Sequence, residues 1–157
     1  MDHGTCRPTG VKWHRHLAVL IFLIIAGHAG SVWAERMSVS ASKANIRSGP
    51  GTAKYEVLWE VERYYPLKVV RRQGEWVFFR DFEGDEGWIH GSLLGKEATV
   101  ITRTDMVNIR SGPGTQHDIV FKAERGVPFR VLKRQGDWIQ IQGADDDKGW
   151  IHKKLVW

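Results

Sequence analysis

The string NIRSGPGT occurs twice in this chain, at residues 45–52 and again at residues 108–115. The surrounding sequence repeats with it, since Gly-Trp-Ile-His stands both at residues 87–90 and at residues 149–152. Catalytic sites are rarely duplicated intact, whereas a copied structural unit carries its turns with it. The chain is therefore predicted to contain two copies of a unit of about 60 residues, each with the same fold.

Each copy is predicted to consist of short strands separated by turns. Residues 138–142 alternate between apolar and polar with a period of two, as a half-buried strand does. Pro66 and Pro128 each open a further strand, at a position where no backbone donor is needed. No segment after residue 34 has the pattern of a helix of three turns. The predicted fold class is therefore all-β.

The repeated string is interpreted as a structural turn, with a direct binding role for the whole string as the alternative. Gly49 precedes a proline and is expected to be extended. Pro50 presets φ for the first corner of a turn, and Gly51 can adopt positive φ at the second. Asn45 can bond backbone amides at the loop entrance. Across both copies the predicted turn residues are Asn45, Gly49, Pro50, Gly51, Asn108, Gly112, Pro113 and Gly114.

Residues 1–34 are predicted to be a signal peptide. A basic stretch at residues 12–16 precedes the apolar run 17–26, and Val32-Trp-Ala34 fits the small-x-small cleavage pattern. An uncleaved inner-membrane anchor is the alternative, but the apolar run is short for a membrane span, which needs about 20 residues. With cleavage after Ala34, the protein would be periplasmic or secreted and would meet the membrane only transiently, through the signal segment.

Composition narrows the function of the part after residue 34. The chain carries 23 basic and 18 acidic side chains, and residues 1–34 hold three and one of these, so the net charge of the remainder is +3. This charge is too small to indicate nucleic-acid binding. The single cysteine, Cys6, precedes the apolar run, so the exported part is expected to have no disulfide and no cysteine-bound metal.

The order of motifs resembles one known family. A strand, the repeated string, Gly-Glu-Trp or Gly-Asp-Trp, then Gly-Trp-Ile-His and a closing leucine resembles the bacterial SH3-like (SH3b) domains, over residues 37–94 and 100–157. The resemblance implies two tandem SH3-like small β-barrels, at residues 35–94 and 100–157, joined by the linker 95–99. Such domains serve as cell-wall-binding modules of peptidoglycan hydrolases and as parts of envelope sensors and adaptors, so the fold alone does not fix the function.

No catalytic residue, metal site or cofactor is predicted. His90 and His152 are repeat equivalents at strand ends, which favours a shared structural role over chemistry. The acidic runs 83–86 and 145–147 lack the spaced ligands of a calcium loop and are expected to be solvated hairpin tips. No phosphate loop, dinucleotide fingerprint or Gly-x-Ser-x-Gly motif is present. The protein is predicted not to be an enzyme.

Binding is the function that remains. Src-homology barrels hold extended ligands in an aromatic-lined groove between loops, which implies a groove near each repeated string. The ligand-binding candidates are Arg47, Tyr55, Tyr64, Tyr65, Trp76, Phe78, Arg110 and Trp138. The arginines are included because a turn does not need arginine at that position. Tyr64, Tyr65 and Phe78 have no aromatic counterpart in the second copy, which favours more of the ligand contact in the first copy; satellite packing or an interface between the barrels is the alternative for these three.

The predicted ligand is peptidoglycan, whose carboxylates Arg47 and Arg110 could meet. The linker spans at most about 18 Å, so two weak sites would lie close enough to act bivalently on a repetitive polymer. One alternative is an adaptor that docks an extended segment of an envelope protein. Another is a structural subunit packed on a larger complex. The sequence predicts no oligomeric state.

Overall fold

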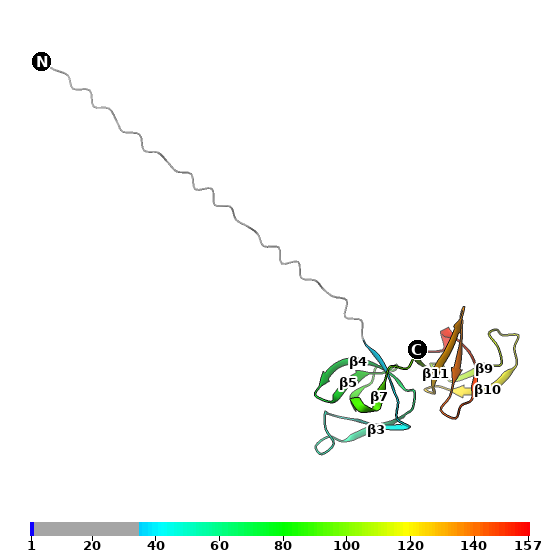
Figure 1. Ribbon diagram of the computed structural model, residues 1–157, viewed down its shortest axis with the longest axis horizontal. Helices are drawn as coiled ribbons and strands as arrows, with labels where there is room; N and C mark the ends of the chain where they lie inside the picture. The colour runs from blue at the N-terminus through cyan, green and yellow to red at the C-terminus, as the bar shows by residue number, and fades with distance from the viewer. Residues whose placement is uncertain (2–34) are drawn as a thin grey trace. The chain divides into compact units, whose positions relative to one another are not determined.

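The computed structural model describes Met1 and residues 35–157, so the predicted signal peptide, residues 1–34, lies outside the described residues apart from Met1. Each copy of the repeat forms its own antiparallel sheet, drawn from cyan to green for the first copy and from yellow to red for the second (Figure 1). The helical segments of residues 35–157 are two single turns, η1 (Gly91–Leu93) and η2 (Lys153–Leu155). The predicted all-β fold is confirmed.

The first barrel has strand order β3-β2-β6-β5-β4-β1-β7. Its strands are β1 (Arg36–Val39), β2 (Lys43–Arg47), β3 (Val57–Glu62), β4 (Pro66–Gln73), β5 (Trp76–Arg80), β6 (Glu86–His90) and β7 (Leu94–Gly95). The second barrel has order β10-β9-β13-β12-β11-β8. Its strands are β8 (Thr99–Ile101), β9 (Met106–Arg110), β10 (Ile119–Glu124), β11 (Pro128–Gln135), β12 (Trp138–Gln142) and β13 (Lys148–His152). The shared order follows from the repeated sequence.

Each barrel has a separate apolar core, built from the inward-facing residues of its alternating strands. The first core contains Val39, Ala44, Ile46, Val61, Leu67, Val77, Phe79 and Ile89. The second contains Val100, Val107, Ile109, Ala123, Phe129, Ile139, Ile141, Ile151 and Val156. Ile46 and Ile109, the apolar residues of the repeated strings, are fully buried. The strings are thereby fixed to the cores of their own barrels.

Two-residue turns set the pairing register of the β4–β5 and β11–β12 hairpins. Gly74 (φ 56°) joins β4 to β5, and Gly136 (φ 58°) does the same between β11 and β12. Glycine adopts positive φ without a steric penalty, which suits these tight hairpins. The next hairpins then place Trp76 opposite His90 and Trp138 opposite His152.

The repeated string forms a tighter turn than expected. The Gly51 amide donates to the Gly49 carbonyl at 3.0 Å, and the same bond joins Gly114 to Gly112, so each proline is the centre of a three-residue turn. The prediction of positive φ at Gly51 and Gly114 is wrong, since neither glycine is among the residues with positive φ.

Close packing explains the first glycine of each pair. A Cβ atom on Gly49 would lie 2.2 Å from the Tyr55 ring, and one on Gly112 would lie 2.6 Å from the His117 ring. Such distances are far inside van der Waals contact. Glycine is therefore needed here because a ring covers the loop, and not because of a left-handed backbone.

Candidate ligand groove

A groove opens beside the repeated string in each barrel. The groove of the first barrel has a volume of about 240 Å³ and is lined by Lys43, Ala44, Asn45, Arg47, Thr52, Trp76, His90 and Leu93. The groove of the second has about 210 Å³ and is lined by Met106, Val107, Asn108, Arg110, Thr115, Trp138, His152 and Leu155. The two sets are repeat equivalents, position by position. The molecule thus carries one groove in duplicate.

Six of the eight lining positions hold the same residue type in both grooves: asparagine, arginine, threonine, tryptophan, histidine and leucine. The two that differ lie at the starts of β2 and β9, where Lys43 and Ala44 of the first barrel correspond to Met106 and Val107 of the second. The shared residues come from three separate segments of each barrel. The common set therefore defines one surface rather than one repeated string.

The tryptophan and the histidine form the wall of each groove. Their rings pack edge to face, with centroids 5.2 Å apart for Trp76 and His90 and 5.4 Å apart for Trp138 and His152. All four side chains are half-buried, since a ring on a cross-strand pair is covered on one side only. Each wall therefore offers a ligand a partly exposed indole beside a partly exposed imidazole.

The histidines also cap the short helical turns η1 and η2, which follow strands β6 and β13. Nδ1 of His90 accepts from the Ser92 amide at 3.4 Å, and Nδ1 of His152 accepts from the Lys154 amide at 3.3 Å. Accepting at Nδ1 leaves the proton of a neutral imidazole on Nε2. Nε2 lies 3.5 Å from a Glu75 oxygen in the first barrel. This capping matches the structural role expected for the repeated histidines.

The arginines close the repeated strings. The Arg47 guanidinium donates to the Tyr55 carbonyl at 3.0 Å, and Arg110 donates to the His117 carbonyl at 2.8 Å. A long donor that reaches across the loop satisfies carbonyls that the strands leave unpaired. Arginine in the string therefore has a structural purpose that sequence reasoning missed, in addition to its place in the groove wall.

The other aromatic candidates lie elsewhere. Tyr64 is buried, with 3% of its surface exposed, and has a φ of 71° at the position of Gly126 in the second copy. Tyr65 packs against the first core, and Tyr55 covers the repeated string. Phe78 stacks on Trp88 with centroids 5.1 Å apart, under the Arg71 guanidinium. The structure thus brings Arg47 together with Trp76 and Arg110 with Trp138, but it does not bring these four aromatics into the groove.

Sequence reasoning missed several residues that line the grooves. Thr52, Leu93 and His90 were not among the ligand candidates, and Asn45 was assigned only to the turn. Identity between the repeats would have found them, because each has the same residue type at the equivalent position of the second groove. Identity alone does not separate groove residues from core residues, however, since Ile46 and Ile109 are also identical.

Charges differ between the two grooves. In the first, Lys43 donates a hydrogen bond to Glu60 at 2.7 Å, which raises the pKa of Lys43, so this edge carries an exposed ion pair. In the second, Met106 occupies that edge. A hydrogen bond from Lys153 lowers the pKa of Asp137, which lies 3.9 Å from His152. The first groove therefore has a charged residue at this edge and the second an apolar one.

Within residues 35–157, no group of three or more histidine, cysteine and acidic side chains is placed to hold a metal ion. Across that same part of the chain, no helix has both the length and the apolar character needed to cross a bilayer.

The relatives found by comparison with known proteins include two proteins whose names describe amidases. The provisionally named N-acetylmuramoyl-L-alanine amidase YrvJ of Bacillus subtilis (strain 168) is 28% identical over 75% of this chain and 24% of its own length. The "Probable cell wall amidase LytH" of Staphylococcus epidermidis (strain RP62A) is 33% identical over 38% of this chain and 21% of its own length. The chain thus spans about a quarter or less of the relatives that it matches.

Among solved structures, an NlpC/P60 family protein from Bacillus cereus ATCC 10987 aligns with 78% of this chain and 56% of its own, at 13% identity and a TM-score of 0.38. A likeness this distant supports no statement about function. The family model for the bacterial SH3 domain matches twice, over residues 40–96 and 103–157. The two matches together cover well over half of the chain and contain both grooves, and the chain therefore belongs to the bacterial SH3 domain family.

Proposed function

We propose that this chain is a non-catalytic binding module of the cell envelope, and that its two grooves bind peptidoglycan glycopeptide. The observation that carries the proposal is the duplicated groove, in which six of eight lining residues are the same. A fold needs its core and its turns repeated. It does not need a half-buried tryptophan and exposed polar groups repeated around an open groove.

The chemistry of the lining residues suits a glycopeptide. The indole faces of Trp76 and Trp138 can cover the apolar face of a sugar or a small side chain. Thr52 and Thr115 are exposed and can exchange hydrogen bonds with hydroxyl or amide groups. Arginine supplies a fixed positive charge for carboxylates. The groove therefore offers apolar, hydrogen-bonding and cationic contacts within one side chain's reach.

The relatives support the same proposal from another direction. Both names carry the word amidase, and the name of LytH also carries the words cell wall, but this chain matches only a quarter or less of their lengths. The SH3 domain matches at residues 40–96 and 103–157 occupy most of this chain, and so most of what it can share with those relatives. We infer that this chain binds the cell wall and does not carry out the amidase reaction.

Co-sedimentation with purified peptidoglycan sacculi tests the proposal. The polypeptide of residues 35–157 should bind saturably, and it should release no soluble muropeptide during prolonged incubation. The absence of saturable sedimentation at low salt would contradict wall binding, and released muropeptide would contradict the non-catalytic assignment. Sacculi stripped of their stem peptides serve as the control that separates peptide recognition from glycan recognition.

Exchanging the residues at the edges of the grooves should change how binding depends on salt. Lys43→Met removes a charge from the first groove, and Met106→Lys adds one to the second; both positions are exposed, so the fold should tolerate either change. We expect the first variant to bind sacculi a few-fold more weakly and the second a few-fold more tightly at low salt, with both differences disappearing near 0.5 M salt, roughly, because salt screens exposed charges. Equal affinity of the two variants at low salt would show that the edges do not touch the polymer.

We also propose that the protein is periplasmic or secreted after cleavage behind Ala34. The basic stretch, apolar run and small-x-small pattern of residues 1–34 support this. Mass spectrometry of the protein recovered from the cell envelope should give a mature chain that starts at Glu35. An intact N-terminus in the membrane fraction would instead favour the inner-membrane anchor.

A further inference from the structure

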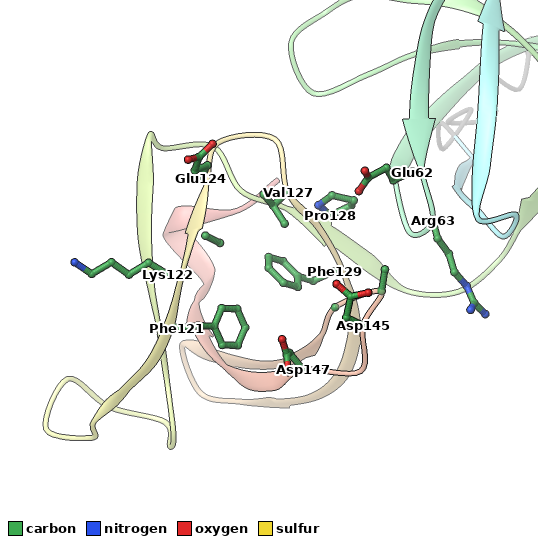
Figure 2. Close-up of a pocket in the computed structure, with 13 residues that line it drawn as sticks. Glu62, Arg63, Phe121, Lys122, Glu124, Val127, Pro128, Phe129, Asp145 and Asp147 are labelled. Carbon is green, nitrogen blue, oxygen red and sulfur yellow. The ribbon is translucent and has the colours of Figure 1, made fainter.

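A third cavity, distinct from the two grooves, lies at one end of the second barrel. Figure 2 draws the side chains that line it. Its volume is about 350 Å³. Eleven residues of the second barrel line it, together with Glu62 and Arg63: Phe121, Lys122, Ala123, Glu124, Val127, Pro128, Phe129, Gly143, Ala144, Asp145 and Asp147. No residue of this set belongs to either groove. The cavity is therefore a separate feature of the surface.

The floor of the cavity is apolar. Phe121 and Phe129 lie with ring centroids 6.4 Å apart, and Val127 packs beside them against the second core. Phe129 is 3% exposed, while Phe121 and Val127 remain half-buried and reachable. Binding is favourable when an apolar side chain moves from water onto a floor of this kind.

The first barrel fills the equivalent place with its own side chains. Tyr65 donates its hydroxyl to an Asp81 oxygen at 2.8 Å and packs edge-on against Phe82, with centroids 6.3 Å apart. Burial and the bond to Asp81 raise the pKa of Tyr65, so the phenol stays protonated and keeps donating. These three side chains, Tyr65, Asp81 and Phe82, form what we call the plug.

The second barrel lacks the plug. Val127, Gly143 and Ala144 stand at the positions of Tyr65, Asp81 and Phe82, so two aromatic rings and a carboxylate are missing there. All three replacements line the cavity. The absence of the Tyr65 and Phe82 rings from the second copy thus leaves a pocket, whereas sequence comparison interpreted the absence of Tyr65 as favouring ligand contact in the first copy.

Acidic groups dominate the rim. Glu62, Glu124, Asp145 and Asp147 face two cationic residues, and the Lys122 side chain extends away from the phenylalanine rings in Figure 2. Among the described residues, none of Glu124, Asp145 and Asp147 takes part in an ion pair. An apolar floor beneath carboxylates without an ion-pair partner is complementary to an apolar side chain flanked by positive charge. It is not complementary to an anionic glycopeptide.

We propose that this pocket binds an extended segment of a partner protein, with one large apolar side chain, aromatic or branched aliphatic, inserted between Phe121 and Val127 and with lysine or arginine beside it. The volume is at the lower end of the range for ligand sites, which suits one side chain rather than a whole cofactor. The second barrel would then carry two different sites, a groove for the wall and a pocket for a protein. This site does not depend on the function proposed for the grooves.

The test uses the full chain and three acetylated, amidated peptides: Lys-Phe-Lys, Lys-Ala-Lys and Glu-Phe-Glu. Binding is measured by NMR titration with a low-millimolar upper limit. We expect Lys-Phe-Lys to bind at least tenfold more tightly than either of the others, because burying a phenylalanine side chain is worth roughly tenfold or more in affinity and the rim adds charge selectivity. The perturbed signals should be those of the cavity residues. No binding of Lys-Phe-Lys, or equal binding of all three peptides, would overturn the proposal.

A variant that rebuilds the plug in the second barrel gives the decisive comparison. It carries Val127→Tyr, Gly143→Asp and Ala144→Phe, residues that the first barrel already accommodates, and a Cβ on Gly143 would have no neighbour closer than 3.7 Å. It should fold, lose Lys-Phe-Lys binding by at least tenfold, and sediment with sacculi as the unaltered chain does. Unchanged peptide binding would overturn the proposal, as would a loss of sacculus binding together with peptide binding, which would make glycopeptide the occupant.

Charge reversal at the rim keeps the proposal testable if the rebuilt barrel fails to fold. Asp145→Lys with Asp147→Lys changes only exposed residues and should shift the preference from Lys-Phe-Lys to Glu-Phe-Glu. An unchanged preference would overturn the assigned role of the rim. Sedimentation velocity of the full chain tests one further occupant, a second copy of this chain. Self-association that the plug variant abolishes would identify that copy as the occupant and would overturn the assignment of a partner protein.

Discussion

Replacing both groove tryptophans, Trp76→Ala with Trp138→Ala, should abolish saturable binding to sacculi, and either replacement alone should weaken it by about a hundredfold. Each change removes the indole that forms one wall of a groove. Two linked sites on one polymer bind more tightly than either alone by about 10²–10⁴, so losing one site removes the gain from bivalency as well as its own contacts. Co-sedimentation over a range of polymer concentrations measures the apparent affinity of each variant.

The matched control is Phe78→Gln. It removes another half-buried aromatic from the same strand, but this one stacks on Trp88 outside the groove, and the second barrel has glutamine at that position. We expect it to sediment as the unaltered protein does. A control that binds as weakly as Trp76→Ala would mean that general loss of packing is being measured, and single tryptophan variants that bind normally would place the wall site elsewhere.

Replacing Phe79 by alanine should melt the first barrel well before the second. Phe79 is fully buried in the first core, and truncating a buried phenylalanine costs about 3–5 kcal/mol. A unit of about 60 residues buries little surface and has a stability of only several kcal/mol, so this loss removes most of it. The midpoint temperature of the first barrel should fall by roughly 15 °C or more. Hydrogen exchange followed by residue distinguishes the two barrels, since each has its own core.

The second barrel supplies the control for this change as well. Ile141 stands at the position of Phe79 and is equally buried, so Phe79→Ile places in the first barrel a residue that the repeat already uses. We expect Phe79→Ile to cost clearly less than Phe79→Ala, because it leaves a smaller cavity. Equal losses for the two variants, or simultaneous melting of both barrels in Phe79→Ala, would contradict independent cores.

Sequence patterns predicted the features that depend on residues close together in the chain. The repeat of NIRSGPGT gave two units, the alternation in residues 138–142 gave strands, and the paired arginine and tryptophan of each copy were placed near the string that they do in fact adjoin. These features depend on spacing along the chain, which a sequence displays directly. Ile46 and Ile109 are the only apolar residues of the two strings, and both are buried.

Other features depended on partners that are distant in sequence. Gly49 is required because the Tyr55 ring covers it, and Arg47 is held by the Tyr55 carbonyl, yet neither partner is indicated by the string itself. Tyr65 was a ligand candidate because the second copy has no aromatic residue at its position. In the structure it instead donates a hydrogen bond to Asp81, sixteen positions further along the chain. An aromatic side chain serves a core and a binding site equally well, so its type does not say which face it meets.

The sequence by itself therefore determined that this protein is two copies of one small β-barrel, with the same turns and the same buried positions, because turns and alternation are local properties. Only the tertiary structure decided which conserved side chains of the repeat share a groove, since strands β2, β5 and β6 must pair before Arg47, Trp76 and His90 can meet. It also decided that the absent plug of the second barrel leaves a pocket, because three replacements spread over eighteen positions act on one space only after β11 and the hairpin beyond β12 come together.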